Sequence, residues 1–525
     1  MVDSLVPEKA YKEILPVNTI KTFVPQIEVP RVVKPAPPRY RNEIAKYIIR
    51  RNDDCIRCGK CAEVCPQGVH ILKPGYKYFT APHQHVCIGP SCQNTDHYCV
   101  ELCPQNALQM VENPMMKVLG DPRWTADMIL ATWKMAETGE PPLPEYGFEY
   151  QCGDSEGGFD RIRFKFPEKP PVEVDESEMD LGIELNRRND GRPLIKIDVP
   201  WYGGGMSFGS VSNITQLSKA RAAVAFNTFT CTGEGGFMEQ LRPFDDHTIT
   251  QVATGLFGVR EDTIQRVRIV EFKYAQGAKP GLGGHLLSDK VTQAVANIRE
   301  TVTGISLFSP FPFHSVYSIE DHKKHLDWIK HTNRLALVST KVSTPIDVDM
   351  VAVGSYSAGT HIVHLDGGYG GTGAAPDIAK KNIAMPIEYA IVKVHDFLST
   401  EGVRDKVTLI ASGGIRTVHD IAKSIALGAD GVVVGTAELV ALGCVRCGRC
   451  ESGRGCPRGI ATTDGDLSKQ LNVEWGTQRI INLYNAWQKG LIEILKRFGM
   501  RSISELRGRT DLLEHLDYTN DVEHR

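Results

Sequence analysis

Two short apolar runs near the C-terminal end constrain the fold more than any other part of the chain. Residues 407–415 are VTLIASGGI and residues 430–436 are DGVVVGT, with a helix-like segment at 418–429 between them. Continuous β-branched runs that close in glycine are typical of buried parallel strands. A strand, a Gly-Gly turn, a helix, a strand and a Gly-Thr turn in succession match the last two units of a (β/α)8 barrel. We therefore expect an α/β fold built around a (β/α)8 (TIM) barrel.

The two glycine turns also predict a cofactor. Loops after strands seven and eight of such barrels commonly bind phosphate through bare backbone N–H groups. Glycine is needed there because a Cβ would keep the backbone away from the phosphate oxygens. The residues in question are Gly413, Gly414, Gly435 and Thr436.

Apolar β-branched runs alternate with helical patterns from about residue 181 onward, which is typical of βα units. Eight candidate strands, the number that a barrel needs, end at Met206, Thr232, Lys273, Phe308, Lys341, Leu365, Ala411 and Gly435. Five regions are expected: an extended proline-rich arm (1–44), a ferredoxin-like domain (45–115), a linker with one helix at 125–138 (116–180), the barrel (181–500) and a helical tail (501–525). The arm would wrap a neighbour or form a flexible lead.

Charge and composition exclude several classes of function. Lys plus Arg total 60 and Asp plus Glu total 63, and a net charge of −3 gives no reason to expect nucleic-acid binding. The N-terminal residues lack the apolar core of a secretory signal, and no membrane span is expected. Fourteen cysteines would be unusual in a cytosolic protein unless most bind metal, and twelve fall in three tight clusters. We expect a cytoplasmic protein in which Cys152 and Cys231 are small core residues.

The first cysteine cluster has the spacing C-x2-C-x2-C-x3-C-P and consists of Cys55, Cys58, Cys61 and Cys65. This spacing places three thiolates around one cuboidal iron–sulfur cluster and directs the fourth at a second cluster. A zinc site usually has two pairs separated by a dozen or more residues, so zinc is disfavoured.

The second run has longer gaps but repeats the x3-C-P ending. We predict two [4Fe–4S] clusters that exchange one ligand. Their ligand sets would be Cys55, Cys58, Cys61 and Cys103 for one, and Cys65, Cys87, Cys92 and Cys99 for the other. A degenerate or zinc-filled second loop is the alternative.

The third cluster follows directly on the phosphate turns and consists of Cys444, Cys447, Cys450 and Cys456. Three of these thiols would suffice for a [3Fe–4S] cluster and four could complete a [4Fe–4S], and the sequence does not decide between them. The nearby phosphate turns weaken a zinc-knuckle interpretation. Their juxtaposition with an iron–sulfur cluster suggests a flavin fed by one-electron carriers.

Seven motifs that follow one another along the chain carry a family resemblance. They are MSFGS (206–210), TGEGG (232–236), QVATGLFGV (251–259), AQGAKPG (275–281), YSIED (317–321), GGTGA (370–374) and GRTDLL (508–513). Residues 200–515 resemble the FMN-binding synthase domain of glutamate synthases, in the split archaeal or bacterial type in which the synthase is its own subunit. Residues 45–110 look like a two-cluster bacterial ferredoxin fused to the N-terminal side of that domain.

The resemblance implies reductive amination. 2-Oxoglutarate and ammonia would give 2-iminoglutarate, and reduced FMN would deliver a hydride to the imine carbon. A dicarboxylate substrate needs cations, and lysines at strand ends and in the following loops lie where barrel active sites are built. The implied catalytic residues are Lys279, Glu234 and Lys273. The implied cofactor-binding residues are Met206, Ser207, Glu234, Lys341, Asp366, Gly367, Gly413, Gly414, Gly435 and Thr436.

The resemblance also implies partners. The chain begins Met-Val-Asp and so lacks the N-terminal cysteine nucleophile of a glutaminase, and no glycine-repeat β-helix follows the barrel. We expect a hetero-oligomer in which ammonia comes from solution or from a class II amidotransferase (glutaminase) subunit, beside a separate β-helix subunit. Since no G-x-G-x-x-G fingerprint follows a strand, electrons would come from a ferredoxin or from an NAD(P)H-oxidising subunit.

Departures from the family pattern leave two alternatives open. Leu256, Leu282, His285, Phe313 and Ser315 replace usual family residues, and segment 366–373 is rearranged to DGGYGGTG. The altered pocket could serve the same flavin chemistry on another amine or oxoacid, for example in N-methylglutamate formation. A barrel that only passes electrons through FMN to a partner is the other alternative, and intact Lys273, Lys279 and Glu234 argue against it. His364 could line the pocket or be a hydrogen-bonded core histidine.

Overall fold

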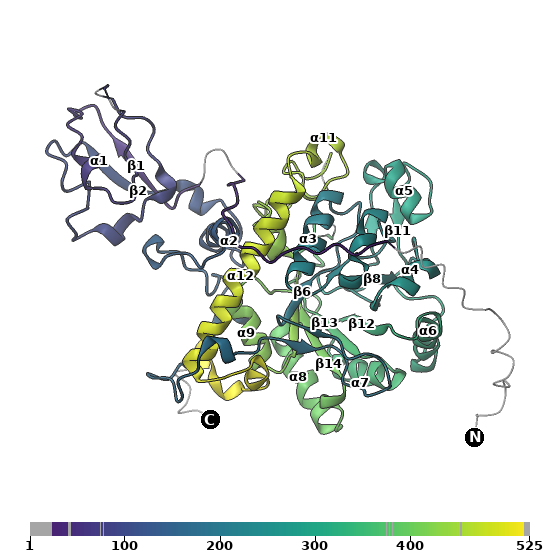
Figure 1. The fold of residues 1–525 in the computed structure, drawn as a ribbon. Coiled ribbons are helices and arrows are strands. Elements are labelled where there is room, and N and C mark those ends of the chain that lie inside the picture. The colour runs from purple at the N-terminus through teal and green to yellow at the C-terminus, as the bar shows by residue number, and fades with distance from the viewer. Residues whose placement is uncertain are drawn as a thin grey trace, which may run out of the picture.

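The computed structural model describes residues 24–39, 44–73, 75–76, 78–373, 375–376, 378–380, 382–451 and 454–518. Eight parallel strands close into a barrel, which confirms the predicted fold class (Figure 1). The strands are β6 (Trp201–Gly203), β7 (Thr230–Cys231), β8 (Thr248–Ala253), β9 (Ile269–Lys273), β12 (Leu337–Ser343), β13 (Ile362–Asp366), β14 (Thr408–Ser412) and β15 (Gly431–Val434).

The strand predicted to end at Phe308 is not part of the barrel. It forms β11 (Leu307–Phe308), which pairs antiparallel with β10 (His285–Leu286) in an excursion after β9. The barrel uses β8 instead, whose sequence TITQVA mixes polar and apolar residues and so lacks the continuous apolar run of a buried strand. All six β8 residues are nevertheless buried, because partners inside the protein satisfy the polar ones: Gln251 Nε2, for example, donates to Glu271 Oε1 at 2.8 Å.

Helices cover the outside of the barrel. They are α3 (Asn213–Ala225), α4 (Glu261–Arg266), α5 (Gln293–Arg299), α6 (Ile319–Thr332), α7 (Val348–Ala358), α8 (Ile387–Thr400), α9 (Val418–Ala426) and α10 (Thr436–Ala441). A short hairpin of β4 (Ile183–Glu184) and β5 (Lys196–Ile197) precedes the first barrel strand. After the barrel come α11 (Gly465–Ser468) and α12 (Val473–Phe498).

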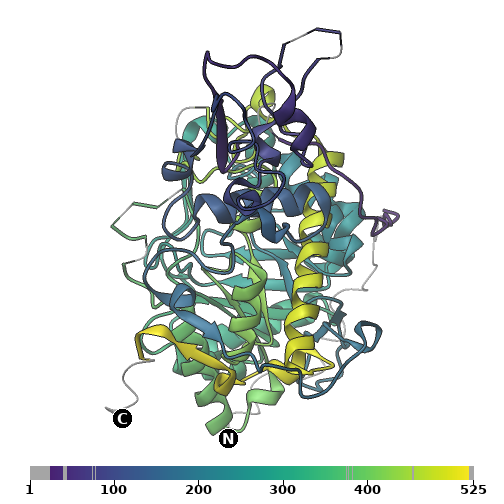
Figure 2. The same cartoon turned by 90° about the vertical axis from the view of Figure 1, so that its left-hand side faces the viewer.

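Helix α12, with 26 residues, holds several parts of the chain together. Asn472 caps its first turn, and Gly499 ends it with a φ of +67°, a left-handed conformation that suits glycine. Its Trp487 ring meets Trp201 of the barrel edge to face, at 5.7 Å between ring centroids. The predicted helix at 125–138 is present as α2 (Ala126–Thr138), which packs against α12 (Figure 2).

The ferredoxin-like domain stands out from the barrel on the side where α2 and α12 run (Figures 1 and 2). Its two ends pair as antiparallel strands, β1 (Tyr47–Arg51) and β2 (Leu108–Glu112), and α1 (Lys60–Val64) lies in the first cysteine loop. Because this pairing joins the two ends, the cysteine loops between them are held in one small unit.

The described part of the N-terminal arm, residues 24–39, lies along α2 and α12 of its own chain. Ala36 N donates to Glu137 O at 2.9 Å, and Asn482 Nδ2 of α12 donates to Lys34 O at 2.9 Å. Residues 1–23 and 40–43 of the predicted arm lie outside the described residues.

The tail expected to be helical contains short 3-10 turns and a strand. That strand, β16 (Leu513–His515), pairs antiparallel with β3 (Ile162–Phe164) of the segment between α2 and the barrel. Within the described part of the chain, no helix combines the length and apolarity that crossing a bilayer requires.

Candidate active site

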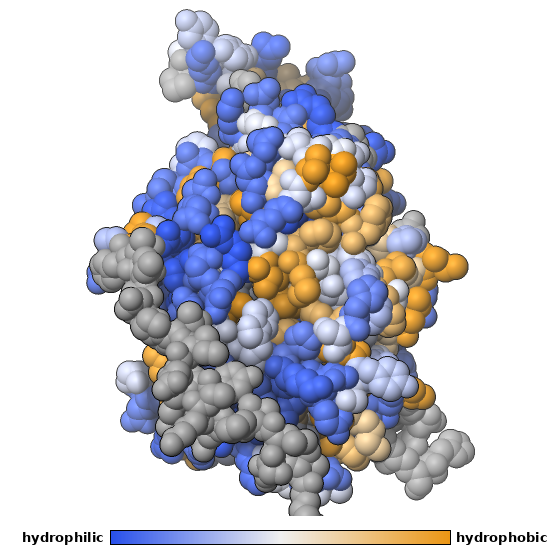
Figure 3. All heavy atoms as spheres, turned by 90° about the vertical axis from the view of Figure 1, so that its right-hand side faces the viewer, coloured by the Kyte–Doolittle hydropathy of each residue, from blue (hydrophilic) through white to orange (hydrophobic). Residues whose placement is uncertain are grey.

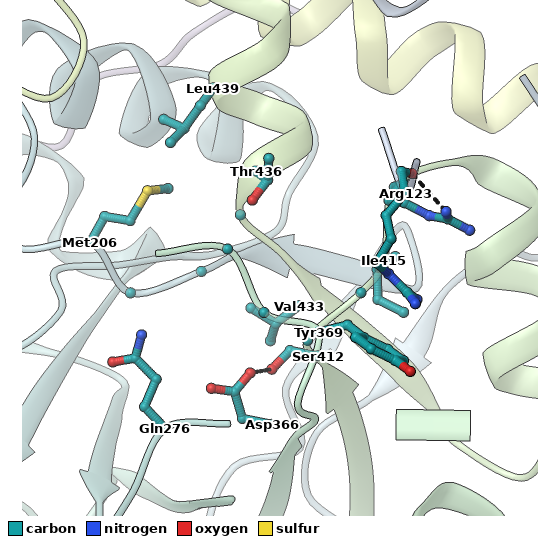
Figure 4. A pocket seen from close by; sticks show the side chains of 18 of the residues that line it. Arg123, Met206, Gln276, Asp366, Tyr369, Ser412, Ile415, Val433, Thr436 and Leu439 are labelled. Atoms are coloured by element: carbon teal, nitrogen blue, oxygen red, sulfur yellow. Dashed lines mark hydrogen bonds between the residues drawn. The ribbon is translucent and has the colours of Figure 1, made fainter. Parts of the chain in front are cut away.

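A pocket opens at the carboxyl ends of the barrel strands, where active sites of this fold lie (Figure 4). Its empty volume is about 870 Å³, counting the space open to solvent. Barrel residues that line it are Gly204, Gly205, Met206, Gln276, Lys341, Asp366, Tyr369, Gly370, Gly371, Ser412, Gly413, Gly414, Ile415, Arg416, Val433, Gly435, Thr436 and Leu439. Both glycine turns predicted to bind phosphate therefore face the same pocket.

The turn after β14 requires glycine. Gly413 and Gly414 have φ values of +90° and +132°, and a Cβ on Gly413 would collide with the backbone of Gly367. Gly435 differs, because a Cβ there would meet nothing within 4 Å, so the space beside it is open to a ligand. The N–H groups of Gly414 and Gly435 have no backbone partner within the described residues. These are the free donors that a phosphate group needs.

A hydrogen-bonded chain of polar side chains forms the floor of the pocket. Asp366 accepts hydrogen bonds from Ser412 Oγ at 2.6 Å and from the N–H of Gly277 at 3.0 Å, and its Oδ2 lies 3.3 Å from Lys341 Nζ. Burial opposes the charge of Asp366, but Lys341, His364 and the hydrogen bonds from Ser412 and Gly277 together outweigh it and hold the pKa of that carboxyl below its usual value. The pair therefore presents an ionised carboxylate and an ammonium at the pocket floor.

His364 is a hydrogen-bonded core histidine and does not line the pocket. Its Nε2 lies 2.8 Å from Ser412 Oγ, and its Nδ1 lies 2.8 Å from Glu271 Oε2. Burial opposes the charge of Glu271, but His364 and Lys341 together lower the pKa of that carboxyl to about 2. The network fixes Ser412, and through it Asp366, against movement.

The three residues predicted to be catalytic lie together beside this floor. Lys273 Nζ at the end of β9 lies 3.4 Å from Glu234 Oε2. Lys273 is also paired in register with Lys341 on β12. Lys279, in the loop after β9, is only 4% exposed, and its backbone N–H donates to Gln276 of the pocket lining at 3.2 Å. Three cations thus lie near one carboxylate, and of these four groups only Lys341 lines the pocket itself.

Electrostatics sets the protonation states of this group. Burial and the neighbouring Lys273 ammonium lower the pKa of Lys279 to about 8. Burial alone would raise the pKa of Glu234, but Lys273, Lys279 and Arg299 outweigh it and hold that pKa below its usual value. At neutral pH, Glu234 is ionised and Lys279 is mostly charged, with its titration midpoint about one pH unit higher.

Three predicted cofactor residues, Ser207, Glu234 and Gly367, are absent from the pocket lining within the described residues, and Glu234 lies instead beside Lys273. The hydroxyl of Ser207 accepts a hydrogen bond from Arg299 Nη2 at 3.0 Å. Gly367 lies directly behind the turn, since its backbone is what a Cβ on Gly413 would strike. The cofactor roles of all three residues stay predictions.

Three residues from outside the barrel line the pocket and were not predicted from the sequence. They are Arg123 and Trp124 before α2, and Arg446 of the third cysteine cluster. Tyr369 was missed as well, and it comes from the rearranged segment 366–373. The Arg123 guanidinium stacks over the Tyr369 ring at 3.3 Å from its centroid. No local pattern marks Arg123, because its place depends on how the linker folds over the barrel.

The eight cysteines of the ferredoxin-like domain line two separate cavities. One is lined by Cys55, Cys58, Cys61 and Cys103, and the other by Cys65, Cys87, Cys92 and Cys99. These are the two ligand sets that the exchange rule predicts. Within the described residues no group of three or more potential ligands is close enough to hold a single metal ion. A cavity inside four thiols suits a multi-iron cluster, and the zinc-filled second loop stays an alternative.

The third cysteine cluster lies against the main pocket. Burial raises the pKa of Cys444 to about 11, with Cys450 and Cys456 adding to the effect, so these thiols are neighbours. A Cβ on Gly373, in the segment after β13, would run into Cys450. Arg446 is in both sites, because it belongs to the cysteine loop and its side chain lines the pocket. Arg446 therefore connects the loop that carries the four thiols to the pocket.

The barrel, the glycine-lined pocket and the adjoining cysteine sites define the class, an oxidoreductase that combines a flavin with iron–sulfur clusters. Residues 160–501 match the family model described as the conserved region in glutamate synthase, and residues 48–69 match the 4Fe–4S binding domain. The chain belongs to the glutamate synthase family and is a glutamate synthase subunit, an oxidoreductase that depends on FMN and iron–sulfur clusters.

Relatives cover almost the whole chain. The archaeal-type glutamate synthase (NADPH) of Dehalococcoides mccartyi is 37% identical over 481 residues, which cover 88% of this chain and 94% of that protein. The archaeal glutamate synthase (NADPH) of Methanocaldococcus jannaschii is 36% identical over 502 residues, covering 91% and 95%. The glutamate synthase (NADPH) large chain of Azospirillum brasilense is 35% identical over 363 residues, which cover 66% of this chain and 23% of that longer protein.

Proposed function

We propose that this chain is the synthase subunit of a multi-subunit glutamate synthase and forms L-glutamate from 2-oxoglutarate and ammonia through 2-iminoglutarate. The observation that carries the proposal is the group of Lys273, Lys279 and Glu234 beside a glycine-lined pocket at the mouth of the barrel. Two ammonium groups suit a dicarboxylate, and a buried position makes each contact stronger than it would be in water.

The pocket fits FMN. Gly413 and Gly414 leave room where a side chain would block the backbone, and Gly414 and Gly435 present free N–H groups. These turns would hold the phosphate, and Met206, Lys341 and Asp366 would surround the ring system. When bound, FMN supplies the hydride that reduces the imine carbon. Lys341 keeps a positive charge at the pocket floor, where it would offset negative charge on a reduced ring.

The cysteine cavities fit iron–sulfur clusters. Each cavity of the ferredoxin-like domain is bounded by four thiols from two different loops, as the C-x2-C-x2-C-x3-C-P spacing requires for ligand exchange. We assign a [4Fe–4S] cluster to each, and a [3Fe–4S] or [4Fe–4S] cluster to Cys444, Cys447, Cys450 and Cys456. The cluster at Cys444, Cys447, Cys450 and Cys456 would lie next to the flavin pocket, so it is the cluster suited to exchange electrons with the flavin.

The chain's own residues bind and orient the substrate in this proposal. Lys273 and Lys279 would each hold a carboxylate of 2-oxoglutarate, and the negative charge of Glu234 keeps the two ammonium groups close together. A Cβ on Gly284 would collide with the Glu234 carboxylate, so the loop after β9 closes over that side chain. This close packing excludes water from the side where the imine must persist.

Ammonia and electrons would come from other subunits or from solution. A glutaminase subunit, a β-helix subunit, and a ferredoxin or NAD(P)H-oxidising subunit are the proposed partners. Apolar side chains gather on the face away from the ferredoxin-like domain (Figure 3). In segment 302–311, which bonds to Gly284 beside Glu234, the side chains of Phe308 and Phe311 are 65% and 57% exposed. Exposed aromatic groups so near the substrate residues suit a partner that delivers ammonia.

An anaerobic half-reaction tests the proposal. The full chain, reconstituted with iron, sulfide and FMN, is reduced with dithionite and mixed with 2-oxoglutarate and ammonium. We expect flavin reoxidation with stoichiometric glutamate, and loss of both in Lys273→Gln. Lys330→Gln, a change of a partly buried lysine on α6, is the matched control. A flavin that stays reduced would contradict the proposal, and reoxidation only with methylamine would assign the chain to the N-methylglutamate alternative.

A further inference from the structure

Arg123 is a buried cation with an incomplete set of partners. The residue is 7% exposed, its Nη1 lies 3.5 Å from Ser155 Oγ, and its guanidinium stacks on the Tyr369 ring. Its Nη2 has no hydrogen-bond partner within the described residues. A buried charge without a hydrogen-bonded counter-ion costs free energy, so we expect a ligand bound at this site to supply the missing counter-ion.

The neighbouring charges neutralise Arg123 only in part. The carboxyl nearest its Nη2 is that of Glu388, since a Cβ on Gly158 would collide with Glu388 Oε1 and lie 3.5 Å from Arg123 Nη2. Arg416, which donates to the carbonyl of Arg123 at 2.7 Å, is fully engaged by Asp160 at 2.6 Å and Asp420 at 2.8 Å. Glu388 is also buried, and neither of its carboxyl oxygens has a partner within the described residues. Burial raises the pKa of Glu388 to about 7, so this carboxyl carries only part of a negative charge at neutral pH. The region therefore attracts an anion.

The free nitrogen of Arg123 lies beside the phosphate turns. An ideal Cβ on Gly414 would be 3.8 Å from Arg123 Nη2, and both residues line the same pocket. Figure 4 shows Arg123 and Tyr369 on one side of the pocket, and Met206 and Gln276 on the opposite side. Nη2 is therefore within reach of an anion that binds the N–H of Gly414.

Asp121 fixes the position of Arg123. Its Oδ1 accepts hydrogen bonds from the backbone N–H groups of Arg123, at 2.9 Å, and Trp124, at 3.0 Å. Its Oδ2 accepts from Arg446 Nη2 of the third cysteine cluster at 2.9 Å. Asp121 thus stabilises the turn that carries Arg123 and links this turn to the cysteine loop. The backbone of Arg123 is therefore positioned before any ligand binds.

We propose that Arg123, supplied by the linker outside the barrel, binds the phosphate group of the FMN held in this pocket. The inference rests on the proposed function in one respect, that FMN is the cofactor. A guanidinium presents parallel donors that match phosphate oxygens, and the phosphate supplies the missing counter-ion. Riboflavin, which has the same ring system without the phosphate, should gain nothing from Arg123.

The test compares FMN with riboflavin. Flavin-free full chain with reconstituted iron–sulfur clusters is titrated with each flavin, and binding is followed by flavin fluorescence quenching. Arg123→Gln should lower FMN affinity roughly 10- to 100-fold, the range expected for one charge-assisted contact, and leave riboflavin affinity unchanged. Arg188→Gln is a matched control that should keep the wild-type ratio. Arg188 also stacks on a tyrosine, Tyr356, but does not line the pocket within the described residues.

The possible outcomes separate the inference from the proposed function. An unchanged ratio of FMN to riboflavin affinity in Arg123→Gln, or an equal loss for both flavins, would overturn the role of Arg123. A weaker affinity of Arg123→Gln for 2-oxoglutarate, together with unchanged FMN binding, would also overturn the role of Arg123 in binding the phosphate. A wild-type chain that binds FMN no better than riboflavin would instead overturn the proposed phosphate site. If Arg123→Gln does not fold, Arg123→Lys carries the test: a smaller loss of FMN preference is expected, and a wild-type ratio overturns the inference.

Discussion

The pKa of Lys279 makes substrate binding depend on pH. At a pKa of about 8, the ratio of charged to neutral Lys279 changes from about 10:1 at pH 7 to about 1:10 at pH 9. If only the charged form binds the dicarboxylate, the apparent dissociation constant rises by the inverse of the charged fraction, about tenfold over this interval. Because the pKa is lowered relative to water, the loss begins well below the range in which an exposed lysine titrates.

Titration with 2-oxoglutarate between pH 7 and pH 9, followed by the flavin absorption spectrum, measures this effect. Lys279→Arg should remove the alkaline loss, since arginine stays charged throughout. Lys330 provides a matched control, because burial lowers its pKa to about 8 as well, while its Nζ donates to Gly359 O far from the pocket lining. Lys330→Arg should keep the tenfold loss. Affinity that is constant with pH in the wild type, or a loss retained in Lys279→Arg, would refute the reasoning.

Three further changes test separate parts of the structure. Gly413→Ala puts a Cβ on a residue with a left-handed φ and against the Gly367 backbone, so we expect at least a roughly tenfold loss of affinity for FMN and a smaller loss for riboflavin, which has no phosphate, by fluorescence titration; an equal loss for both would contradict the phosphate role of this turn. Cys99→Ser should remove about four iron atoms per chain and spare the other ferredoxin-like cluster; iron analysis and electron paramagnetic resonance would detect it, and unchanged iron would contradict the assignment. Asp160→Asn leaves the buried Arg416 with one carboxylate fewer and should destabilise the barrel by about 3–5 kcal/mol in denaturant unfolding, whereas an effect under about 1 kcal/mol would contradict it.

The parts of the fold that the sequence predicts are those set by short-range chemistry. The strands β14 and β15 have continuous apolar runs, and the cysteine spacings impose ligand geometry locally. Strand β8 escaped prediction because Gln251 is satisfied by Glu271, a partner on the next strand that only the closed barrel supplies. The same holds for the helical tail: β16 becomes a strand because residues 162–164, far away in sequence, pair with it.

The site residues likewise fall into those that local sequence predicts and those that it does not. Gly413 and Gly414 could be found because a glycine pair after a buried strand has a direct structural meaning. Arg123 could not, because a single arginine in a linker resembles any solvated charge until the linker is placed over the pocket. The pairing of Lys273 with Glu234 lies between these cases, since the family motifs name both residues but only the barrel brings β7 and β9 to the same side.

The contacts between helix α12 and the N-terminal arm imply an order of assembly during translation. The helix supplies hydrogen bonds to Lys34 O from Asn482 and to Val32 O from Gln478, so a segment translated before the ferredoxin-like domain is held by one translated after the barrel. The ferredoxin-like cavities are complete once β2, at residues 108–112, has left the ribosome, more than 300 residues before α12 exists. Iron can therefore be loaded into that domain while the barrel is still being translated, whereas the arm cannot be held in place until α12 has been translated.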